Sequence, residues 1–210
     1  MYTCSMRFQW GSERVKVSKE QVRENRARIV EAASVLFRER GYDGVGIAEL
    51  MSAAGLTHGG FYKHFASKAD LLSEAMSCGF RRSAESSLGV EREKFIADYL
   101  SRQHRDAMGK GCVMSALGTD TARQSESIKA TFSAGIERQL SLLADENGAG
   151  SATRADLIDT LAHLVGALVL SRACPDDSTL ADEILDVCRS RLLAQEAQED
   201  VGGEFSAPIT

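Results

Sequence analysis

Proline and the alternating pattern of β-strands are both scarce in this sequence. Only two prolines occur in 210 residues, Pro175 and Pro208, and both lie late in the chain. Long stretches free of proline and rich in Ala, Leu, Glu and Arg favour helices, because these side chains lose little rotamer freedom in a helix. Apolar residues make up 43% of the chain, enough for a substantial core. The composition therefore predicts an all-α protein.

Long apolar runs and paired cysteines are missing as well. The best apolar candidate, Leu164–Leu170, is far shorter than the roughly 20 residues that a membrane helix needs. The N-terminus lacks the apolar core of a signal peptide. The five cysteines show neither CxxC pairs nor metal-ligand spacing, so we expect reduced thiols. We therefore expect a cytoplasmic protein that holds no metal and no cofactor and does not enter a membrane.

Charge is distributed unevenly along the chain, although its net value is only −5. Residues 1–75 contain 11 Lys/Arg and 9 Asp/Glu, a net charge of +2, and the remainder contains 14 and 21, a net charge of −7. A phosphate backbone responds to the nearest surface rather than to the total charge. The asymmetry therefore suits a chain whose N-terminal end faces DNA.

The first element expected is a helix that begins after Ser18 and ends at Gly41. Ser18 and Gln21 have the S-x-x-Q spacing of a capping box, in which the hydroxyl and the amide satisfy free backbone groups. Apolar side chains then recur at three- and four-residue steps, as on one face of a helix. Gly41 can adopt the left-handed conformation that ends a helix.

Two short helices and a long one are expected next. The second helix covers residues 47–54, a tight turn follows at Gly55, and Thr57 can cap a third short helix. A long helix then covers residues 68–88. Two short helices joined by a tight turn that contains glycine, with longer helices on either side, have the plan of a helix-turn-helix.

Five more helices are expected downstream, which brings the total to about nine. They cover residues 91–100, 112–123, 125–145, 153–173 and 180–197. Residues 101–111 are expected to form a connection between the first two.

The stretch from Ile47 to Leu72 carries the most specific signal in the chain. It reads IAELMSAAGLTHGGFYKHFASKADLL and closely resembles the DNA-binding signature of the TetR/AcrR repressor family. Residues 28–42, RIVEAASVLFRERGY, are similar to the first helix of that family. The close resemblance covers about residues 18–75, and beyond Leu72 only the helix pattern and length are similar.

The resemblance implies two domains and a function. Residues 18–66 would form the helix-turn-helix DNA-binding domain, and residues 67–197 a helical ligand-binding and dimerisation domain. We expect a flexible N-terminal arm at 1–17 and a flexible tail at 198–210. The implied function is that of a ligand- or redox-responsive transcriptional regulator, most often a repressor. It would bind a palindromic double-stranded DNA operator as a homodimer and be released by a small-molecule or electrophile effector.

Seven residues are the candidates for DNA binding. They are Thr57, His58, Gly59, Tyr62, Lys63, His64 and Lys68. The side chains at 57, 58 and 63 project from the start and middle of the recognition helix, where they can reach base edges or phosphates. Those at 62 and 64 can donate to phosphate oxygens, and glycine at 59 lets the backbone approach closely. Lys68 stands in the first turn of the next helix, where an anion is favoured.

Alternatives exist for several of these residues. Tyr62 and Phe65 could be plain core aromatics, and His64 taken alone would more often be a surface histidine. One position departs from the family pattern: Gly46 stands where many members carry Ser or Thr, which cap a helix better and touch phosphate. That departure puts one phosphate contact in doubt.

Two helices near the C-terminus are the candidates for the dimer interface. Residues 153–173 are apolar on more than one face, so this helix must be buried broadly. Within it, Gly166 and Ala167 permit close helix approach, and residues 184–193 carry a second apolar stripe. The resemblance implies that the two helices pair across a two-fold axis. The alternative is an ordinary core within one chain.

Ligand contacts are expected from Met and Phe side chains, because these line adaptable apolar cavities. The candidates are Met76, Phe80, Met108, Cys112, Met114, Leu117, Phe132, Ile136, His163 and Arg172. Most of them could equally be core residues, and His163 on an apolar helix is more often a satisfied core histidine.

Cys112 is a candidate redox or electrophile sensor. It would stand at the N-terminus of a helix, near Lys110, Arg102 and Arg105, and both features favour a reactive thiolate. The Gly-Cys step is similar to that of family members that sense oxidants or electrophiles. The alternative is a small buried hydrophobic residue that happens to begin a helix.

Two other classes of protein are disfavoured by the sequence. An enzyme is disfavoured because the sequence has no Ser/His/Asp order, metal cluster or phosphate-binding glycine loop, and its four histidines share no ligand spacing. A helical interaction module that has lost DNA affinity is disfavoured by the basic and hydrogen-bonding residues that remain in the signature. Salt dependence of DNA binding would separate that module from a regulator.

Overall fold

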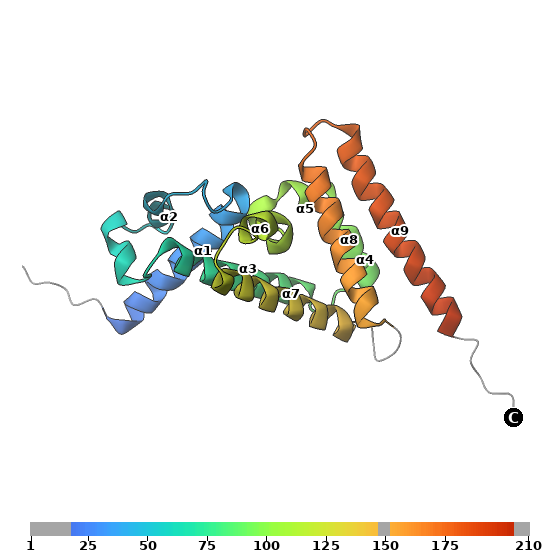
Figure 1. Cartoon of the computed structure of the whole chain (residues 1–210), viewed down its shortest axis with the longest axis horizontal. Helices are drawn as coiled ribbons and strands as arrows, with labels where there is room; N and C mark the ends of the chain where they lie inside the picture. The colour runs from blue at the N-terminus through green and yellow to red at the C-terminus, as the bar shows by residue number, and fades with distance from the viewer. Residues whose placement is uncertain (1–17, 147–151, 204–210) are drawn as a thin grey trace, which may run out of the picture.

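The chain folds into helices only, as expected. The computed structural model describes residues 18–146 and 152–203, and within these ranges it contains nine α-helices, two 3₁₀ turns and no strand. The molecule is elongated (Figure 1), with the N-terminal helices at one end and the last two helices at the other. The arm predicted at residues 1–17 lies outside the described residues, as do residues 204–210 of the tail predicted at 198–210, while residues 198–203 of that tail are helical.

Three elements form the N-terminal end: α1 (Lys19–Arg40), α2 (Ile47–Ala53) and the 3₁₀ turn η1 (His58–Lys63). They are held together by side chains with 0% exposure, among them Phe37, Leu50 and Phe61. The third short helix was expected to be α-helical, and the structure has a 3₁₀ turn instead. Two consecutive glycines at 59 and 60 weaken an α-helix there, and the tighter turn is common in short pieces.

Caps define the ends of α1 as expected, with one correction. The Ser18 hydroxyl accepts from the Gln21 backbone N–H at 3.0 Å, and Gly41 ends the helix with a φ of 73°. The Gln21 side chain, however, bonds to Glu24 and Asn25 instead of turning back to the cap. Only half of the predicted capping box is therefore present.

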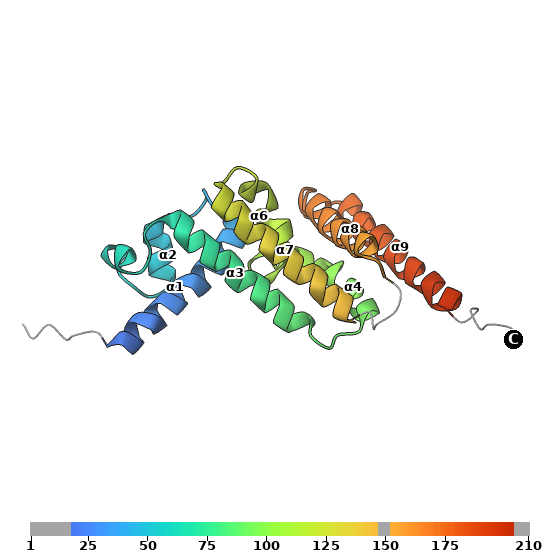
Figure 2. The same cartoon turned by 60° about the horizontal axis from the view of Figure 1, so that its bottom comes forward.

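The long helix α3 (Lys68–Ser87) connects the two ends of the molecule. Its first turn is capped by the Ser67 hydroxyl, which accepts from the Asp70 backbone N–H at 3.0 Å. It packs against α1 near its start and runs beside α7 (Glu126–Glu146) for much of its length (Figure 2). α6 (Val113–Thr121) lies between α1 and α8 and contacts both.

The connection expected at residues 101–111 is partly helical, which corrects that prediction. After α4 (Arg92–Tyr99), it contains α5 (Arg102–Asp106) and the 3₁₀ turn η2 (Met108–Lys110). The Ser101 hydroxyl caps α5 by accepting from the His104 backbone N–H at 3.1 Å. A five-residue helix is too short to show an apolar period, so periodicity does not reveal it.

The last two helices, α8 (Arg154–Arg172) and α9 (Thr179–Gly203), pack against each other at the end away from α1 and α2 (Figure 1). α9 ends at Gly203, six residues beyond the expected end of the last helix at 197. In the part of the chain that is described, no helix is long and apolar enough to cross a membrane.

Candidate nucleic-acid interface

The η1 turn presents a polar surface above a buried aromatic anchor. Phe61 is fully buried, and Tyr62 packs on it edge to face, with ring centroids 5.2 Å apart, while staying 69% exposed. Thr57, His58, Gly59 and Lys63 are also exposed. Five of the seven predicted DNA-binding residues therefore share one accessible turn. The core alternative is wrong for Tyr62 and correct for Phe65, which is 2% exposed.

Lys68 is less free than the sequence suggested. Its ammonium donates to the Tyr42 backbone carbonyl and lies 4.2 Å from the centre of the Tyr42 ring. Burial lowers the pKa of Lys68, and nearby Asp43 partly offsets this. The ammonium has three protons to donate, and one of them bonds to the Tyr42 carbonyl, which fixes the side chain at the start of α3.

His64 is half-buried, and its Nδ1 atom is buried without a hydrogen-bond partner. Burial lowers the pKa of His64, and the positive charges of Arg26 and Lys63 lower it further. The neutral ring is therefore favoured near neutral pH, and it has one N–H to donate.

Arginines on α1 differ in what they can contribute. Arg26 is committed to the protein, because it forms an ion pair with Glu74 through both terminal nitrogens and lies 4.2 Å over the Phe65 ring. Arg28 is exposed, and its Nη2 lies 2.5 Å from where a Cβ on Gly55 would stand. It has no ion-pair partner in the described ranges, so its charge adds to this surface. The basic run before Gly41 was the signal for it.

Gly46, which departs from the family pattern, provides no side-chain cap for α2. It precedes α2 without a side-chain cap, and a Cβ placed on it would meet nothing within 4 Å. A serine or threonine would fit there, and its absence removes one candidate hydroxyl from the surface.

The loop after α1 ties this surface to the rest of the molecule. The Tyr42 backbone N–H donates to Asp120 Oδ2 on α6 at 2.8 Å, while the Tyr42 carbonyl accepts from Lys68. Gly41, next in the chain, has no room for a side chain, because a Cβ would lie 2.7 Å from Asp120 Oδ2. Asp120 and Tyr42 were not singled out by sequence reasoning.

The predicted ligand contacts do not converge on one cavity. Met76, Phe80 and Met114 are buried core residues, as is Leu117. Phe132 packs edge to face on Phe80 at 5.6 Å. The remaining candidates lie elsewhere: Met108 is 40% exposed on η2, while Ile136 and His163 are partly buried on α7 and α8. The Met and Phe side chains at helical spacing therefore pack into the core instead of lining a ligand cavity.

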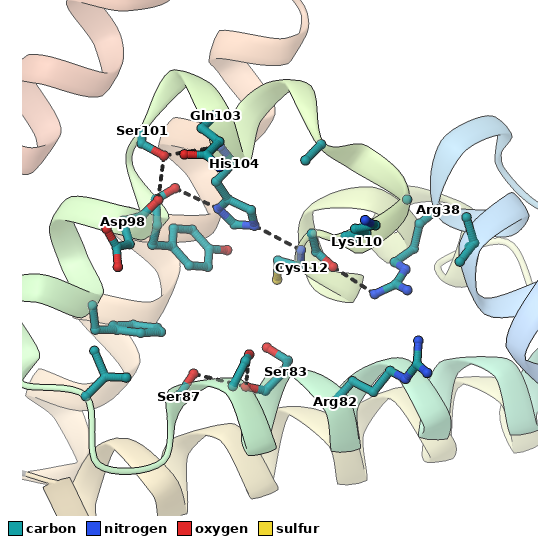
Figure 3. A pocket seen from close by; sticks show the side chains of 18 of the residues that line it. Arg38, Arg82, Ser83, Ser87, Asp98, Ser101, Gln103, His104, Lys110 and Cys112 are labelled. Carbon is teal, nitrogen blue, oxygen red and sulfur yellow. Dashed lines mark hydrogen bonds between the residues drawn. The ribbon is translucent and has the colours of Figure 1, made fainter.

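A cavity of about 720 Å³ lies elsewhere, between α1, α3, α4, α5 and the segment that leads into α6 (Figure 3). Of the predicted contacts, only Cys112 lines it. The volume is within the range of small-molecule sites. Sequence reasoning missed the cavity because its wall comes from five separate elements.

Cys112 stands at the N-cap of α6, as predicted, and is 4% exposed. Its backbone N–H donates to His104 Nε2 at 3.2 Å, and His104 Nδ1 donates to the Tyr99 carbonyl at 2.7 Å. Burial lowers the pKa of His104, in agreement with a neutral ring that accepts at Nε2. Burial also raises the pKa of Tyr99, and the adjacent Cys112 raises it further.

The cationic neighbours of Cys112 differ from the expected ones. Arg102 forms an ion pair with Asp182 at 2.8 Å, and Arg105 with Asp106 at 2.7 Å. Instead, Arg38 donates to the Gly111 carbonyl at 2.9 Å, and Arg172 donates to the His104 carbonyl at 3.0 Å. Lys110 lines the same cavity, as the sequence suggested.

Known proteins resemble this chain most clearly over the first helices. Residues 29–75 match the model of the bacterial regulatory proteins of the tetR family. The regulator AcrR of Shigella flexneri is 34% identical over 84 residues, which are 40% of this chain and 39% of AcrR. The regulator TtgR of Pseudomonas putida is 41% identical over 58 residues, 28% of each chain. The chain thus spans less than half the length of the curated relatives it matches.

Solved structures share the fold over most of the chain. A TetR regulator from Chloroflexus aurantiacus matches with a TM-score of 0.67 and 21% identity, over 85% of this chain and 97% of that one. The reduced form of NemR from E. coli matches with a TM-score of 0.64 and 20% identity, over 80% and 95%.

The named relatives are transcriptional regulators, in agreement with the expectation that the chain is not an enzyme. The matched first helices and the shared all-helical fold agree with the signature in the sequence. The first helices of this chain therefore match the tetR family of bacterial regulatory proteins, and the chain shares the fold of TetR regulators of known structure.

Proposed function

We propose that this protein is a cytoplasmic DNA-binding transcriptional repressor that binds a palindromic operator as a homodimer and is released by an effector. The observation that carries the proposal is the exposed η1 turn, where Tyr62 and Lys63 project above the buried Phe61. Such a turn can enter a groove while its anchor fixes its orientation. One relative, KstR2 of Mycobacterium tuberculosis, which is 34% identical over 56 residues, is named a transcriptional repressor.

The division into two domains is part of the proposal. Residues 18–66 would read DNA, and residues 67–197 would sense the effector and form the dimer. The Asp120–Tyr42 hydrogen bond crosses the boundary, and α3, which begins just after it, packs against α1, so a change in the sensing part can move the reading part. An effector shifts the equilibrium only by its different affinity for the two arrangements.

The apolar face that α8 and α9 leave exposed supports the homodimer. Ile158, Val169 and Leu170 on α8 are 37–59% exposed, and Leu180 and Val187 on α9 are each 52% exposed. A Cβ on Gly166 would meet nothing within 4 Å, so a partner helix could approach closely there. The other face of α8, including Leu164 and Leu168, is core within one chain. The buried face of α8 is therefore intrachain core, and its exposed face supports the proposed interface.

We also propose Cys112 as the residue through which an oxidant or electrophile would act. Its sulfur lies on the wall of the cavity, at the N-terminus of α6, with Arg38, His104 and Arg172 around the Gly111-Cys112 step. A structural neighbour, NemR, was solved in a reduced form. Replacing Cys112 with Ser should abolish the loss of DNA binding under oxidant, and an unchanged response would refute this role.

The proposed function is tested by fluorescence anisotropy with a duplex from the gene's own upstream region, beside a scrambled duplex, over a series of salt concentrations. A regulator binds the first duplex selectively, and its affinity falls steeply as salt rises. Lys63→Gln should reduce the slope of log affinity against log salt by about 0.9 per protomer. Lys94→Gln, on exposed α4 away from η1, removes the same charge and should leave the slope unchanged.

Weak and equal binding of both duplexes at low salt, with no effect of Lys63→Gln, would contradict the proposal. It would favour the helical interaction module instead.

A further inference from the structure

Arg38 is a buried cation without a carboxylate partner. Its side chain is in the core at 5% exposure and lines the cavity. Its Nε donates to the Ser34 carbonyl at 2.8 Å and its Nη1 to the Gly111 carbonyl at 2.9 Å, both neutral acceptors. Within the described ranges no ion pair includes Arg38. An uncompensated charge is costly to bury, so a site that keeps one has a reason to do so.

The charged neighbours of Arg38 include Arg82 and Glu31, but neither forms an ion pair with Arg38 in the described ranges. Burial lowers the pKa of Arg38, the next largest influence, Arg82, lowers it further, and Glu31 raises it. Arg82 itself forms an ion pair with Glu31, and both side chains line the cavity. Glu39 lies against Gly109, outside the cavity lining, and does not reach the guanidinium.

Lys110 supplies a second uncompensated cation to the same wall. It is exposed, and its ammonium has no ion-pair partner among the residues that the structure describes. The two carboxylates of the lining are already paired, Glu31 with Arg82 and Asp98 with Lys94. Arg38 and Lys110 lie together at one end of the cavity (Figure 3), and Asp98 lies toward the other.

The rest of the wall is apolar or weakly polar. Val35, Val90, Phe95 and Tyr99 contribute apolar surface. Ser87 donates its hydroxyl proton to the Ser83 carbonyl of its own helix at 3.0 Å, so this proton is not free for a ligand. His104 is neutral and uses both ring nitrogens within the protein. A ligand would therefore meet positive charge at one end and apolar surface along its body.

We propose that the cavity binds an organic carboxylate, with the carboxylate against Arg38 and Lys110 and an apolar body against Val90 and Phe95. This deepens the proposed function, because it names the class of effector for the cavity assigned there. A planar guanidinium matches a carboxylate in geometry and in charge. One buried guanidinium balances one negative charge, which favours a monoanion. The volume of about 720 Å³ accommodates a body of drug-like size.

The test is isothermal titration of the full chain without DNA. The probes are 3-phenylpropanoate and octanoate, each beside its own neutral amide, and inorganic phosphate as an anion without an apolar body. Each acid should bind at least about tenfold more tightly than its amide, because only the acid can pair with the buried cation. Phosphate should bind more weakly than either acid.

Variants assign the charge to its residues. Arg38→Lys keeps the charge but loses the planar fork, and should weaken acid binding at least about tenfold. Lys110→Gln changes an exposed side chain, so the fold should be retained while acid binding weakens several-fold. Lys129→Gln, on α7 outside the cavity lining, serves as the matched control and should bind the acids as the unmodified protein does. Circular dichroism of each variant shows whether it is folded. If Arg38→Lys does not fold, the result for Lys110→Gln alone decides the proposal.

Amides that bind as tightly as the acids would overturn the proposal, as would acid affinities unchanged by Lys110→Gln. The absence of heat from either acid up to about 10 mM, which means binding weaker than about 3 kcal/mol, would also overturn it. Tighter binding of phosphate than of both acids would replace the carboxylate with a phosphate ligand. The titration uses no DNA, so its failure leaves the operator test unaffected. Acid binding without any effect on DNA affinity would instead refute the proposed release.

Discussion

The hydrogen bond from Tyr42 N–H to Asp120 should stabilise the fold and hold in place the reading surface, which is the exposed face of residues 57–63 that we propose contacts DNA. Asp120 Oδ2 accepts at 2.8 Å, and the Asp120 side chain is 24% exposed. The same residue pairs with Arg123 at 3.1 Å through its other oxygen. Asp120→Ala removes both contacts and leaves the Tyr42 N–H without its acceptor. We therefore expect a loss of stability and a looser loop after α1.

The two contacts differ in what they contribute. A hydrogen bond to a charged group is worth about 1.5–3 kcal/mol. The Arg123 guanidinium is 71% exposed, so that ion pair contributes less than about 1 kcal/mol. In a chain of this size each kcal/mol lowers the melting temperature by about 2–4 °C. Asp120→Ala removes both contacts and should therefore lower the melting temperature by roughly 3–16 °C.

Thermal unfolding followed by far-ultraviolet circular dichroism measures the effect directly. Arg123→Ala is the matched control, because it removes the ion pair and leaves the hydrogen bond to Tyr42. Asp120→Asn keeps an acceptor and should fall between the two. Since the Tyr42 carbonyl accepts from Lys68, Asp120→Ala should also weaken operator binding. Equal melting temperatures for Asp120→Ala and Arg123→Ala would refute the reasoning, because the hydrogen bond would then contribute nothing.

Three further predictions concern single positions. Gly59→Ala should leave the melting temperature unchanged, because its Cβ meets nothing within 4 Å, and should weaken operator binding if the backbone approaches DNA there. Gly135→Ala should destabilise the protein by about 1–3 kcal/mol in urea unfolding despite its better helix propensity, since its Cβ would lie 2.3 Å from the Phe80 ring. The stability of the fold should fall as pH drops through the unfolded histidine pKa of about 6.5, because the folded pKa of His104 is lowered and the unfolded chain binds the extra proton first. His104→Gln should flatten that pH dependence without abolishing it, because the pKa of His64 is lowered too, and an unchanged slope would contradict the assignment.

The helices and the reading surface could be predicted because their signals are local. Ser18, Gly41 and Ser67 mark helix ends through groups a few residues away, so a single sequence carries the information. The exposed η1 residues belong to one contiguous signature. The 3₁₀ form of that turn was missed, although the paired glycines at 59 and 60 disfavour an α-helix.

The cavity and the coupling contacts could not be predicted because they join distant segments. Arg38 reaches the Gly111 carbonyl across 73 positions, and Tyr42 reaches Asp120 across 78. The sequence favoured Met and Phe as ligand contacts. Large apolar side chains are more often buried in the core, however, and Met76 and Phe80 lie there. The charged residue that distinguishes the cavity sits on α1, a helix that the sequence assigned to the reading half.

The position of α6 gives the cavity a short physical route to the reading surface. The helix begins at the Gly111-Cys112 step on the cavity wall, and near its other end Asp120 holds the backbone of Tyr42. Its nine residues span only about 14 Å at 1.5 Å per residue. A helix this short and packed against α1 and α8 moves as one body, so a ligand that displaces Gly111 also displaces the Tyr42 loop and the acceptor of Lys68. Asp120→Ala should therefore uncouple carboxylate binding from DNA release, leaving acid affinity intact while acid no longer lowers operator affinity. Release that persists in this variant would assign the coupling to α3 instead.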